Sequence, residues 1–407
     1  MQTIYYTQKI VVGKLLKTGE LTSSDIKNEI IFINSNDFLN ISKWVTLPKC
    51  ILIYESGIFS HFVSYCISNE IPIGIVSNEE IELFINNNIV IDFYNEIITL
   101  SSIKNLITKE KTYDNVNIVQ TVDGTNIELY ATIKNYKNAM FAKKIGIKSA
   151  GLISTEFFYL NGNLSYDECK TILFKICENF KNGTSSIRLF DYDENKSNSN
   201  DKTKIERGVR AYNIPNYYNI LINQLKSCME LNKHYNIEIV IPFVTNIDDI
   251  IFIKSKLREL NIEIPLCAMI ENPAAFLSAN QFSDIVNSFS IGTNDLLQYF
   301  FASDRDSICS NNNYINPYSR SLMEFLSLYP KEVINKTRVC GQLPIYPYML
   351  QVLIQLGFRK FSIPAPMIPF TAKKINNMTI KKDFINSYKT IPNDYELKKY
   401  IVDAMLK

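Results

Sequence analysis

The feature that most constrains this fold is a rhythm of eight short apolar runs between residues 127 and 363. Most segments between the runs are long enough for a helix, and two of them, 247–260 and 348–356, place apolar residues at helical spacing. Eight strand–helix units over about 280 residues predict an α/β chain with a (β/α)8 TIM barrel. The predicted strands are 127–133, 150–153, 186–190, 237–242, 265–270, 288–292, 338–340 and 360–363.

Polar residues follow most of these predicted strands. In a (β/α)8 barrel the C-terminal ends of the strands share one face, and that face carries the chemistry. The match between polar residues and strand ends therefore supports the barrel and predicts a site at its mouth. The residues are Thr155, Glu156, Asp191, Glu271, Asn294, Asp295 and Cys340.

Glu271 and Asp295 are the candidate metal ligands. Glu271 follows the predicted strand 265–270, and Asp295 closes a Gly-Thr-Asn-Asp run after the next strand. Two carboxylates at neighbouring strand ends can share Mg²⁺ or Mn²⁺, with substrate oxygens and water in the remaining positions. The alternative is that both side chains only cap the helices that follow them. The barrel context favours the metal.

Three arginines, Arg188, Arg210 and Arg305, are candidate clamps for phosphate and carboxylate groups. A guanidinium binds such anions through two parallel hydrogen bonds. Because a surface arginine is usually just solvated, each residue alone is weak evidence. Arg188 is the hardest to assign to the surface, since it lies in an apolar run that continues through Leu189 and Phe190. Together with the carboxylates, these arginines predict a magnesium–phosphate site.

Residues 1–100 have a different organisation, with short strand-like runs and one segment of helical spacing. They predict a compact α/β domain. Residues 101–114 are polar and contain a charge cluster, as expected of a linker, and residues 115–400 then form the barrel. The predicted strands of the first domain are 4–16, 29–33, 50–54, 73–76 and 89–92, and the predicted helix is 59–69.

The composition argues against several other classes of protein. Lysine and arginine (43) nearly balance aspartate and glutamate (41), and a net charge of +2 is not that of a nucleic-acid binder. The eight cysteines form no Cys-x-x-Cys pair, which disfavours a disulfide framework or a zinc site and favours a reducing cytoplasm. We find neither a signal-peptide core nor an apolar run of about 18 residues, so we expect no membrane span.

Eight segments of the sequence match, in order, the motifs of one enzyme family. They are GLISTEFFYL (151–160), SIRLFD (186–191), RGVRAY (207–212), VIPFVT (240–245), AMIENPAA (268–275), SIGTNDLLQYFFASDR (290–305), VCGQL (339–343) and LGFRKFSI (356–363). On these segments, residues 115–370 resemble the phosphoenolpyruvate (PEP) binding barrel of the PEP-utilising enzymes. That family includes enzyme I of the bacterial phosphotransferase system, PEP synthase and pyruvate phosphate dikinase.

The resemblance extends to GIFSHFVSYCISNEIPIGIV (57–76), which is similar to the family's phosphohistidine segment. There a Thr-Ser-His sequence opens a helix, and His61 stands at this place. A helix N-terminus favours a phosphoryl group, and a neutral imidazole nitrogen can accept one. The alternative is that His61 is only a helix-capping residue. The other histidine, His234, lies in a polar segment and is expected to be solvated.

The resemblance implies a PEP-dependent phosphotransferase with two stations. The mobile first domain would bring His61 to the phosphorus, pyruvate would leave with a proton from Cys340, and the phosphohistidine would serve a protein or small-molecule acceptor. A homodimer is implied by analogy only. The residues implied to hold PEP are Arg188, Arg210, Asn294 and Arg305, with Mg²⁺ or Mn²⁺ on Glu271 and Asp295.

Three residues depart from the family pattern. Ser154 stands where the family has an arginine that helps bind the anionic groups of the substrate, and one lost charge-assisted contact costs about 1.5–3 kcal/mol. Gln342 replaces a glutamate, and Phe59 replaces a threonine. These changes keep two alternatives open, a catalytically impaired PEP-binding regulatory homologue and a barrel acting on another enolate-forming substrate.

The predicted histidine domain begins at residue 1 of the sequence. The family's dikinases and synthases have a nucleotide-binding domain ahead of this domain, and enzyme I has a helical insertion that docks a carrier protein. We expect neither in this sequence, which also has no Walker-type phosphate loop. The phosphoryl acceptor is therefore not identified from the sequence.

Overall fold

The computed structural model of this chain divides into two compact units. One unit comprises Met1–Tyr113 with Phe301–Asn316, and the other comprises Asp114–Phe300 with Pro317–Lys407. The structure describes residues 2–5, 10–18, 21, 26–27, 29–34, 46–54, 59–77, 81–93, 97–101, 116, 119–159, 164–191, 214–305, 314–381 and 384–406.

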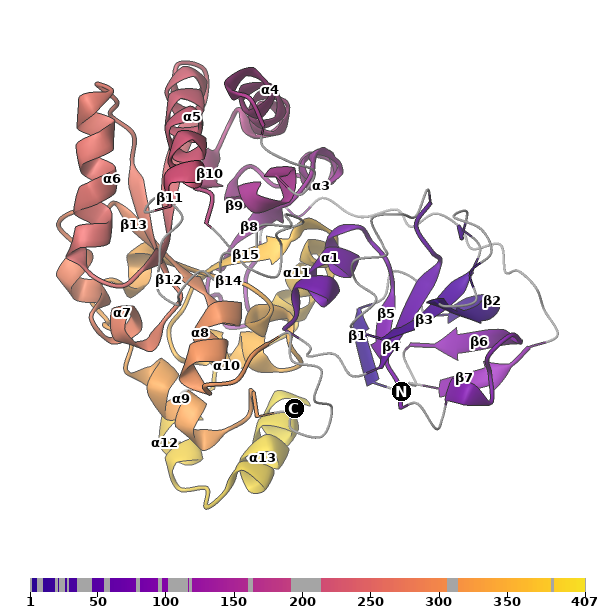
Figure 1. The fold of residues 1–407 in the computed structure, drawn as a ribbon. Coiled ribbons are helices and arrows are strands. Elements are labelled where there is room, and N and C mark those ends of the chain that lie inside the picture. Colours follow the sequence, from indigo (N-terminus) through magenta and orange to yellow (C-terminus); the bar gives the residue numbers. More distant parts are fainter. Residues whose placement is uncertain are drawn as a thin grey trace. The chain divides into compact units, whose positions relative to one another are not determined.

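The second unit contains a closed barrel of eight parallel strands (Figure 1). Strands that follow one another in the chain are paired, and the last closes onto the first with Ser362 opposite Tyr130. The predicted (β/α)8 fold is therefore confirmed. The strands are β8 (Glu128–Ile133), β9 (Ala150–Ser154), β10 (Thr184–Arg188), β11 (Asn236–Val244), β12 (Leu266–Ile270), β13 (Ser288–Gly292), β14 (Thr337–Cys340) and β15 (Lys360–Pro364).

Helices cover the outside of this barrel (Figure 1). Two of them begin with capping boxes, in which Ser165 and Asn246 accept a backbone hydrogen bond and the third helical residue returns one. The helices are α3 (Tyr136–Lys144), α4 (Tyr166–Cys177), α5 (Pro215–Asn232), α6 (Ile247–Glu259), α7 (Pro273–Leu277), α8 (Thr293–Phe300), α9 (Arg320–Ser327), α10 (Met349–Gln355), α11 (Ile368–Asn376), α12 (Phe384–Lys389) and α13 (Asp394–Leu406). Short 3₁₀ turns are η3 (Thr155–Tyr159), η4 (Glu178–Phe180), η7 (Ala279–Phe282), η8 (Ile334–Lys336), η9 (Leu343–Ile345) and η10 (Ala365–Met367).

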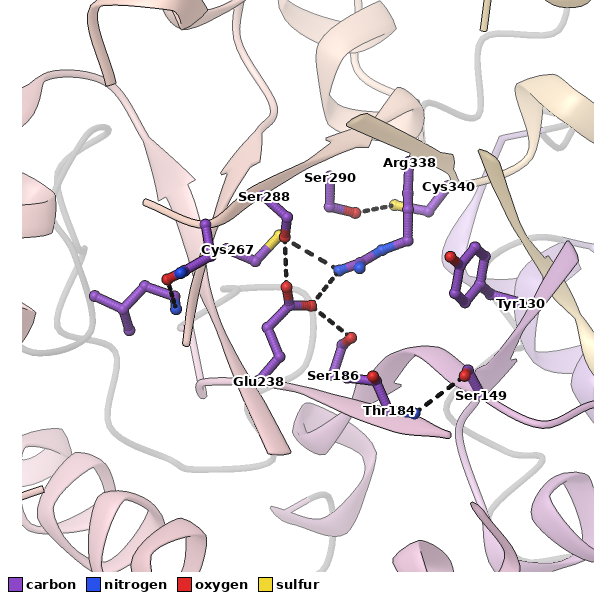
Figure 2. Close-up of polar contacts among 12 residues, drawn as sticks. Tyr130, Ser149, Thr184, Ser186, Glu238, Cys267, Ser288, Ser290, Arg338 and Cys340 are labelled. Atoms are coloured by element: carbon purple, nitrogen blue, oxygen red, sulfur yellow. Dashed lines mark hydrogen bonds and ion pairs between the residues drawn. The ribbon is translucent and has the colours of Figure 1, made fainter. Parts of the chain in front are cut away.

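The barrel interior is stacked in layers, because alternate residues of each strand point inward. The layer in the N-terminal half of the strands is polar and is centred on an ion pair between Glu238 of β11 and Arg338 of β14, 2.6 Å apart (Figure 2). The next layer is mainly apolar and includes Leu152, Val240 and Met269. Two residues further along each strand, the next inward-facing side chains lie at the C-terminal mouth of the barrel.

Glu238 satisfies its buried carboxylate with partners from other strands. Oε2 accepts a hydrogen bond from Ser186 at 2.6 Å, and Oε1 accepts one from Ser288 (Figure 2). Burial alone raises the pKa of Glu238, but Arg338 and these hydroxyls outweigh burial and lower it. The guanidinium of Arg338 also lies 5.7 Å from the ring centroid of Tyr130. One polar cluster thus connects five strands of the barrel.

The first unit is built on a seven-stranded mixed sheet in the order β1-β5-β4-β3-β2-β6-β7. Its central pairs β2–β3, β3–β4 and β4–β5 are parallel, and the remaining pairs are antiparallel. Helix α1 (His61–Ser68) connects β4 to β5 and buries Phe62, Val63, Cys66 and Ile67. The strands are β1 (Gln2–Tyr5), β2 (Ile10–Lys17), β3 (Ile30–Asn34), β4 (Cys50–Tyr54), β5 (Ile73–Ile75), β6 (Asn88–Asp92) and β7 (Ile97–Leu100).

Two expectations for the first unit were wrong in detail. The run 4–16 is not one strand, since β1 ends at Tyr5 and β2 begins at Ile10. The sequence also missed β7, a mostly exposed strand that pairs with β6 at one edge of the described sheet. The predicted linker 101–114 lies almost entirely outside the described residues. Within the described part of the chain, no helix has the length and apolar character needed to cross a membrane.

Candidate active site at the mouth of the barrel

Arg188 lies at the C-terminal end of β10, and two carboxylates hold its guanidinium. Nη2 is 2.6 Å from Glu156 Oε1, and Nη1 is 3.8 Å from Glu271 Oε1. Burial alone lowers the pKa of Arg188, but the carboxylates outweigh burial and raise it, so the guanidinium stays charged. Its Nε is buried without a hydrogen-bond partner in the described structure. Arg188 is thus fixed in place with one donor unused.

Glu271 directly follows β12, and the backbone of β11 holds it. Its Oε2 accepts a hydrogen bond from the N–H of Phe243 at 3.0 Å. Phe243 has a left-handed φ of 51° and lies where the register of β11 on β12 shifts, as in a β-bulge. A non-glycine residue in this conformation costs of order 1–3 kcal/mol. The strained backbone of the bulge therefore directs the Phe243 N–H at the Glu271 carboxylate.

The last residue of β13, Gly292, leaves room for that carboxylate. A Cβ at this position would lie 2.6 Å from Glu271 Oε1 and 2.7 Å from its Cγ. Both separations are shorter than non-bonded atoms tolerate, so glycine is required by close approach of the side chain and not by its own φ. The glycine of the Gly-Thr-Asn-Asp sequence thus leaves the space that the Glu271 side chain occupies.

The pair of Glu271 and Asp295 fits a divalent cation. Burial, and next the nearby carboxylate of Asp295, raise the pKa of Glu271 to about 8. Asp295 is half-buried in the first turn of α8. A buried carboxylate whose charge is disfavoured by a second carboxylate beside it suits a hard cation such as Mg²⁺, which would relieve the repulsion. No group of three or more metal-ligating side chains occurs among the described residues, so water and substrate would have to complete the coordination.

Cys340, the last residue of β14, presents a buried thiol. Its S–H donates to the carbonyl oxygen of Ile291 at 3.2 Å. Its Sγ accepts from the hydroxyl of Ser290 at 3.4 Å (Figure 2). Burial raises the pKa of Cys340 to about 11, and the charges of Glu271 and Arg188 also act on it. The thiol therefore stays protonated at neutral pH, which suits a proton donor and not a thiolate nucleophile.

Hydrogen bonds tie the segment after β13 to the segment after β14. Thr293 donates its hydroxyl to the carbonyl oxygen of Cys340 at 2.7 Å, and Asn294 Oδ1 accepts from the N–H of Gln342 at 2.8 Å. Gly341, with φ of +90°, permits this approach, since a Cβ there would lie 2.3 Å from the Thr293 hydroxyl. The side chain of Gln342 is 4% exposed, and neither of its amide atoms has a hydrogen-bond partner in the described structure.

A second set of contacts supports the backbone at Arg188. The hydroxyl of Thr155 donates to the carbonyl oxygen of Arg188 at 2.8 Å and accepts from Gln224 Nε2 at 2.9 Å. Gln224 Oε1 in turn accepts from the N–H of Phe190 at 2.8 Å. Sequence reasoning missed Gln224, Phe243, Ser290 and Thr293 as parts of this site. Gln224 lies inside α5, where nothing in the helical pattern distinguishes it from other polar residues.

The structure brings together only some of the residues predicted for the site. Electrostatic influence links Arg188, Glu271, Asp295 and Cys340 at the mouth. Asn294 is beside them through its contact with the segment after β14. The other predictions are placed as follows: Arg305 is buried in the segment Phe301–Asn316 of the first unit, Arg210 lies outside the described residues, and His61 is the first residue of α1 with its side chain outside the description.

Comparisons with known proteins agree with the barrel. The family model for the PEP-utilising enzyme PEP-binding domain matches residues 108–380. The phosphoenolpyruvate-protein phosphotransferase of Buchnera aphidicola subsp. Acyrthosiphon pisum is 29% identical over 77% of this chain and 59% of its own length. That of Mycoplasma pneumoniae is 30% identical over 72% of this chain and 54% of its own length. Multiphosphoryl transfer protein 2 of Escherichia coli is 28% identical over 61% of this chain and 32% of its own length. The chain thus spans at most 59% of the length of these three relatives.

Proposed function

The chain belongs to the PEP-utilising enzymes, and from this premise we propose that it is a phosphotransferase that moves the phosphoryl group of PEP to His61 and releases pyruvate. The observation that carries the proposal is the mouth of the barrel. It combines a fixed guanidinium, a pair of carboxylates and a protonated thiol within mutual electrostatic range. PEP requires all three, because it is an anion whose enolate must be stabilised and then protonated.

In the proposed complex the protein holds both anionic groups of PEP. Arg188 offers its Nε, and Asn294, whose Oδ1 accepts from Gln342, offers its side-chain NH₂ group. We assign Arg210 and Arg305 to the same task from their motif positions. Glu271 and Asp295 would hold Mg²⁺, which supplies charge stabilisation to the phosphate and the enolate when bound. Support for the metal comes from the carboxylate pair and the raised pKa of Glu271.

The proposed chemical step exchanges one bond to phosphorus for another. The bond between phosphorus and the enolate oxygen breaks, and a bond to a neutral imidazole nitrogen of His61 forms. The electron pair of the broken bond stays on the enolate. Cys340 then donates its thiol proton to the methylene carbon, which gives pyruvate, and the thiolate regains a proton from water. A pKa of about 11 means that the thiol holds this proton until the enolate, a stronger base, takes it.

The local structure around His61 is compatible with a phosphoryl acceptor. His61 begins α1, and Ser60 caps the helix by accepting a hydrogen bond from the N–H of Val63 at 3.3 Å. The other N–H groups of the first turn point along the helix axis, where they attract negative charge. In the proposed cycle the phosphohistidine passes its group to a protein or small-molecule acceptor. The proposed enzyme is a cytoplasmic homodimer, by analogy with its family.

The decisive test is the mass of the intact chain after incubation with PEP and Mg²⁺. We expect the addition of one phosphoryl group, together with one pyruvate released per chain when no acceptor is present. His61→Ala should abolish the modification. His234→Ala is the matched control, because His234 is the exposed second histidine and should leave the modification unchanged. An unmodified wild-type chain, or an added phosphoryl mass that persists in His61→Ala, would refute the assignment.

A second candidate function is PEP binding without turnover. The buried Ser154 in place of an arginine, and the buried amide of Gln342 without partners, favour a mouth that has changed its use. Calorimetric binding of PEP together with no pyruvate and no mass change would select this candidate. Binding followed by pyruvate release would select the phosphotransferase.

A further inference from the structure

We propose that Lys134 is an anion-binding residue of this mouth, taking the role that Ser154 is too short and uncharged to fill. The inference rests on the proposed function, because the anion is PEP. Lys134 directly follows β8, and no motif or family resemblance pointed to it. Four observations support it, namely strand register, the inward face of β8, the fixed backbone at Lys134 and the charge of the mouth.

Strand register places Lys134 beside the anion site. Ile133 of β8 pairs with Ile153 of β9, so the next residues in register are Lys134 and Ser154. Ser154 in turn pairs with Arg188 of β10. Residues in register on neighbouring parallel strands point to the same side of the sheet. Extending this register by one residue past the end of β8 puts Lys134 in a row with Ser154 and Arg188.

The inward face of β8 shows to which side this row points. Thr132 lies two residues before Lys134, and its hydroxyl is 2.9 Å from that of Ser362 inside the barrel. Tyr130, two residues earlier, faces Arg338 in the polar layer (Figure 2). Continuing the alternation directs Lys134 to the interior, at the level of the mouth.

The backbone at Lys134 is also fixed. Its N–H donates to Oδ1 of Asn138 at 3.3 Å, and Asn138 is buried in α3. Asn135, the next residue, caps α3 by accepting from the N–H of Asn138 at 2.9 Å. Lys134 itself is half-buried. A lysine held this way can bury its stem and still deliver its ammonium to an anion.

The charge of the mouth favours a further cation beside Arg188. Glu156 and Glu271 both lie against Arg188, and Asp295 adds a third carboxylate. PEP adds a phosphate and a carboxylate to this set. Even with a divalent cation, and with Arg210 and Arg305 as proposed above, an ammonium in the same row as Arg188 offsets part of this negative charge.

The test measures PEP affinity by calorimetry, with Mg²⁺ present, in the full chain carrying His61→Ala so that no transfer consumes the ligand. Lys134→Met should weaken PEP binding about 10- to 100-fold, the loss expected for one charge-assisted contact. Lys137→Met is the matched control, because it removes the same charge from an exposed position three residues on. It should leave the affinity unchanged. Adding Ser154→Arg to Lys134→Met should recover most of the loss, since it returns a cation to the same row.

Two results would overturn the role of Lys134. Equal PEP affinities in Lys134→Met and Lys137→Met would show that the ammonium does not contact the anion. A loss that Ser154→Arg fails to recover, together with a lowered unfolding temperature, would show that Lys134 only supports the fold. Failure of the parent chain to bind PEP at all would instead refute the proposed function, so the two failures are distinguishable.

Discussion

Replacing Gly292 by alanine tests the geometry of the mouth most directly. The added Cβ would lie 2.6 Å from Glu271 Oε1, 2.7 Å from Cγ and 2.9 Å from Cδ. Because ordinary contacts begin at about 3.4 Å between such atoms, the carboxylate must move by several tenths of an ångström or more. The strand cannot yield instead, since Gly292 is paired with Cys340 of β14.

The displacement has two costs of different kind. Glu271 would lose or stretch its hydrogen bond from Phe243, now 3.0 Å, which contributes about 0.5–1.5 kcal/mol. We therefore expect the free energy of unfolding to fall by about 1–3 kcal/mol, the usual range for overpacking. We expect the rate of pyruvate release to fall about 100-fold, because a misplacement of about 1 Å at a reacting centre has that effect.

The assay follows pyruvate release from PEP with Mg²⁺, and urea unfolding measures stability. Gly151→Ala is the matched control. Its Cβ would also meet an atom at 2.6 Å, but that atom is the Cβ of Tyr130 in the barrel interior, away from the mouth. Gly151→Ala should lose stability and keep its activity per folded molecule. Gly292→Ala combined with Glu271→Asp, which shortens the side chain, should recover stability. If Gly292→Ala kept full activity, or if both alanine variants lost activity alike, the inferred crowding of Glu271 would be wrong.

Two further predictions concern buried ionisable groups. Cys340→Ser should slow pyruvate release by about 10²–10⁴-fold, as expected for loss of a general acid. In the wild type the thiol keeps its proton from neutral pH upward and loses it only near its raised pKa of about 11, so a rate profile that falls from thiol ionisation near pH 8 would contradict this assignment. Glu238→Gln should destabilise the chain by about 3–5 kcal/mol, because it leaves Arg338 buried without its counter-charge; Glu263→Gln, on the surface, is the control. Since the pKa of Glu238 is lowered in the folded state, its stabilisation is present above the ordinary glutamate pKa and is lost as pH falls through the lowered value. Urea midpoints measured across acidic pH in both variants check the sign.

The barrel was predictable because its strands are buried on both faces. Such strands appear as short continuous apolar runs, and 288–292 was predicted with the observed bounds. The strand β10 was predicted two residues late, as 186–190 instead of Thr184–Arg188. Its first residues are polar because Ser186 serves the buried cluster around Glu238, and Leu189 is buried after the strand ends. Tertiary contacts therefore made the first residues of β10 polar, so the sequence pattern missed them. They also buried Leu189, so the predicted strand ran past the observed end.

The site was predictable only where a side chain carries its own chemical signal. Carboxylates, arginines and a cysteine at strand ends indicate a site, and Glu271, Arg188 and Cys340 were predicted in this way. The bulge at Phe243 gives no such signal, because a phenylalanine does not indicate a left-handed φ. The support from Gln224 depends on a contact between residues 69 positions apart. Lys134 was missed because its significance appears only when the register of three strands is known.

The two ends of the barrel interior shift the pKa of a buried glutamate in opposite directions, and the N-terminal end stabilises the fold that carries the mouth. At the N-terminal end, the carboxylate of Glu238 is fully partnered and its pKa is lowered, so that end stabilises the folded state. At the mouth, burial and Asp295 raise the pKa of Glu271, and Phe243 holds a strained φ, so that end costs stability. If the mouth binds PEP as proposed, its charged groups must not be fully neutralised by one another beforehand, since groups already neutralised gain little from binding. The cluster between β11 and β14 holds the strands in register while the mouth is strained. It follows that changes at Glu238 should alter stability before activity, and changes at Glu271 should alter activity more than stability.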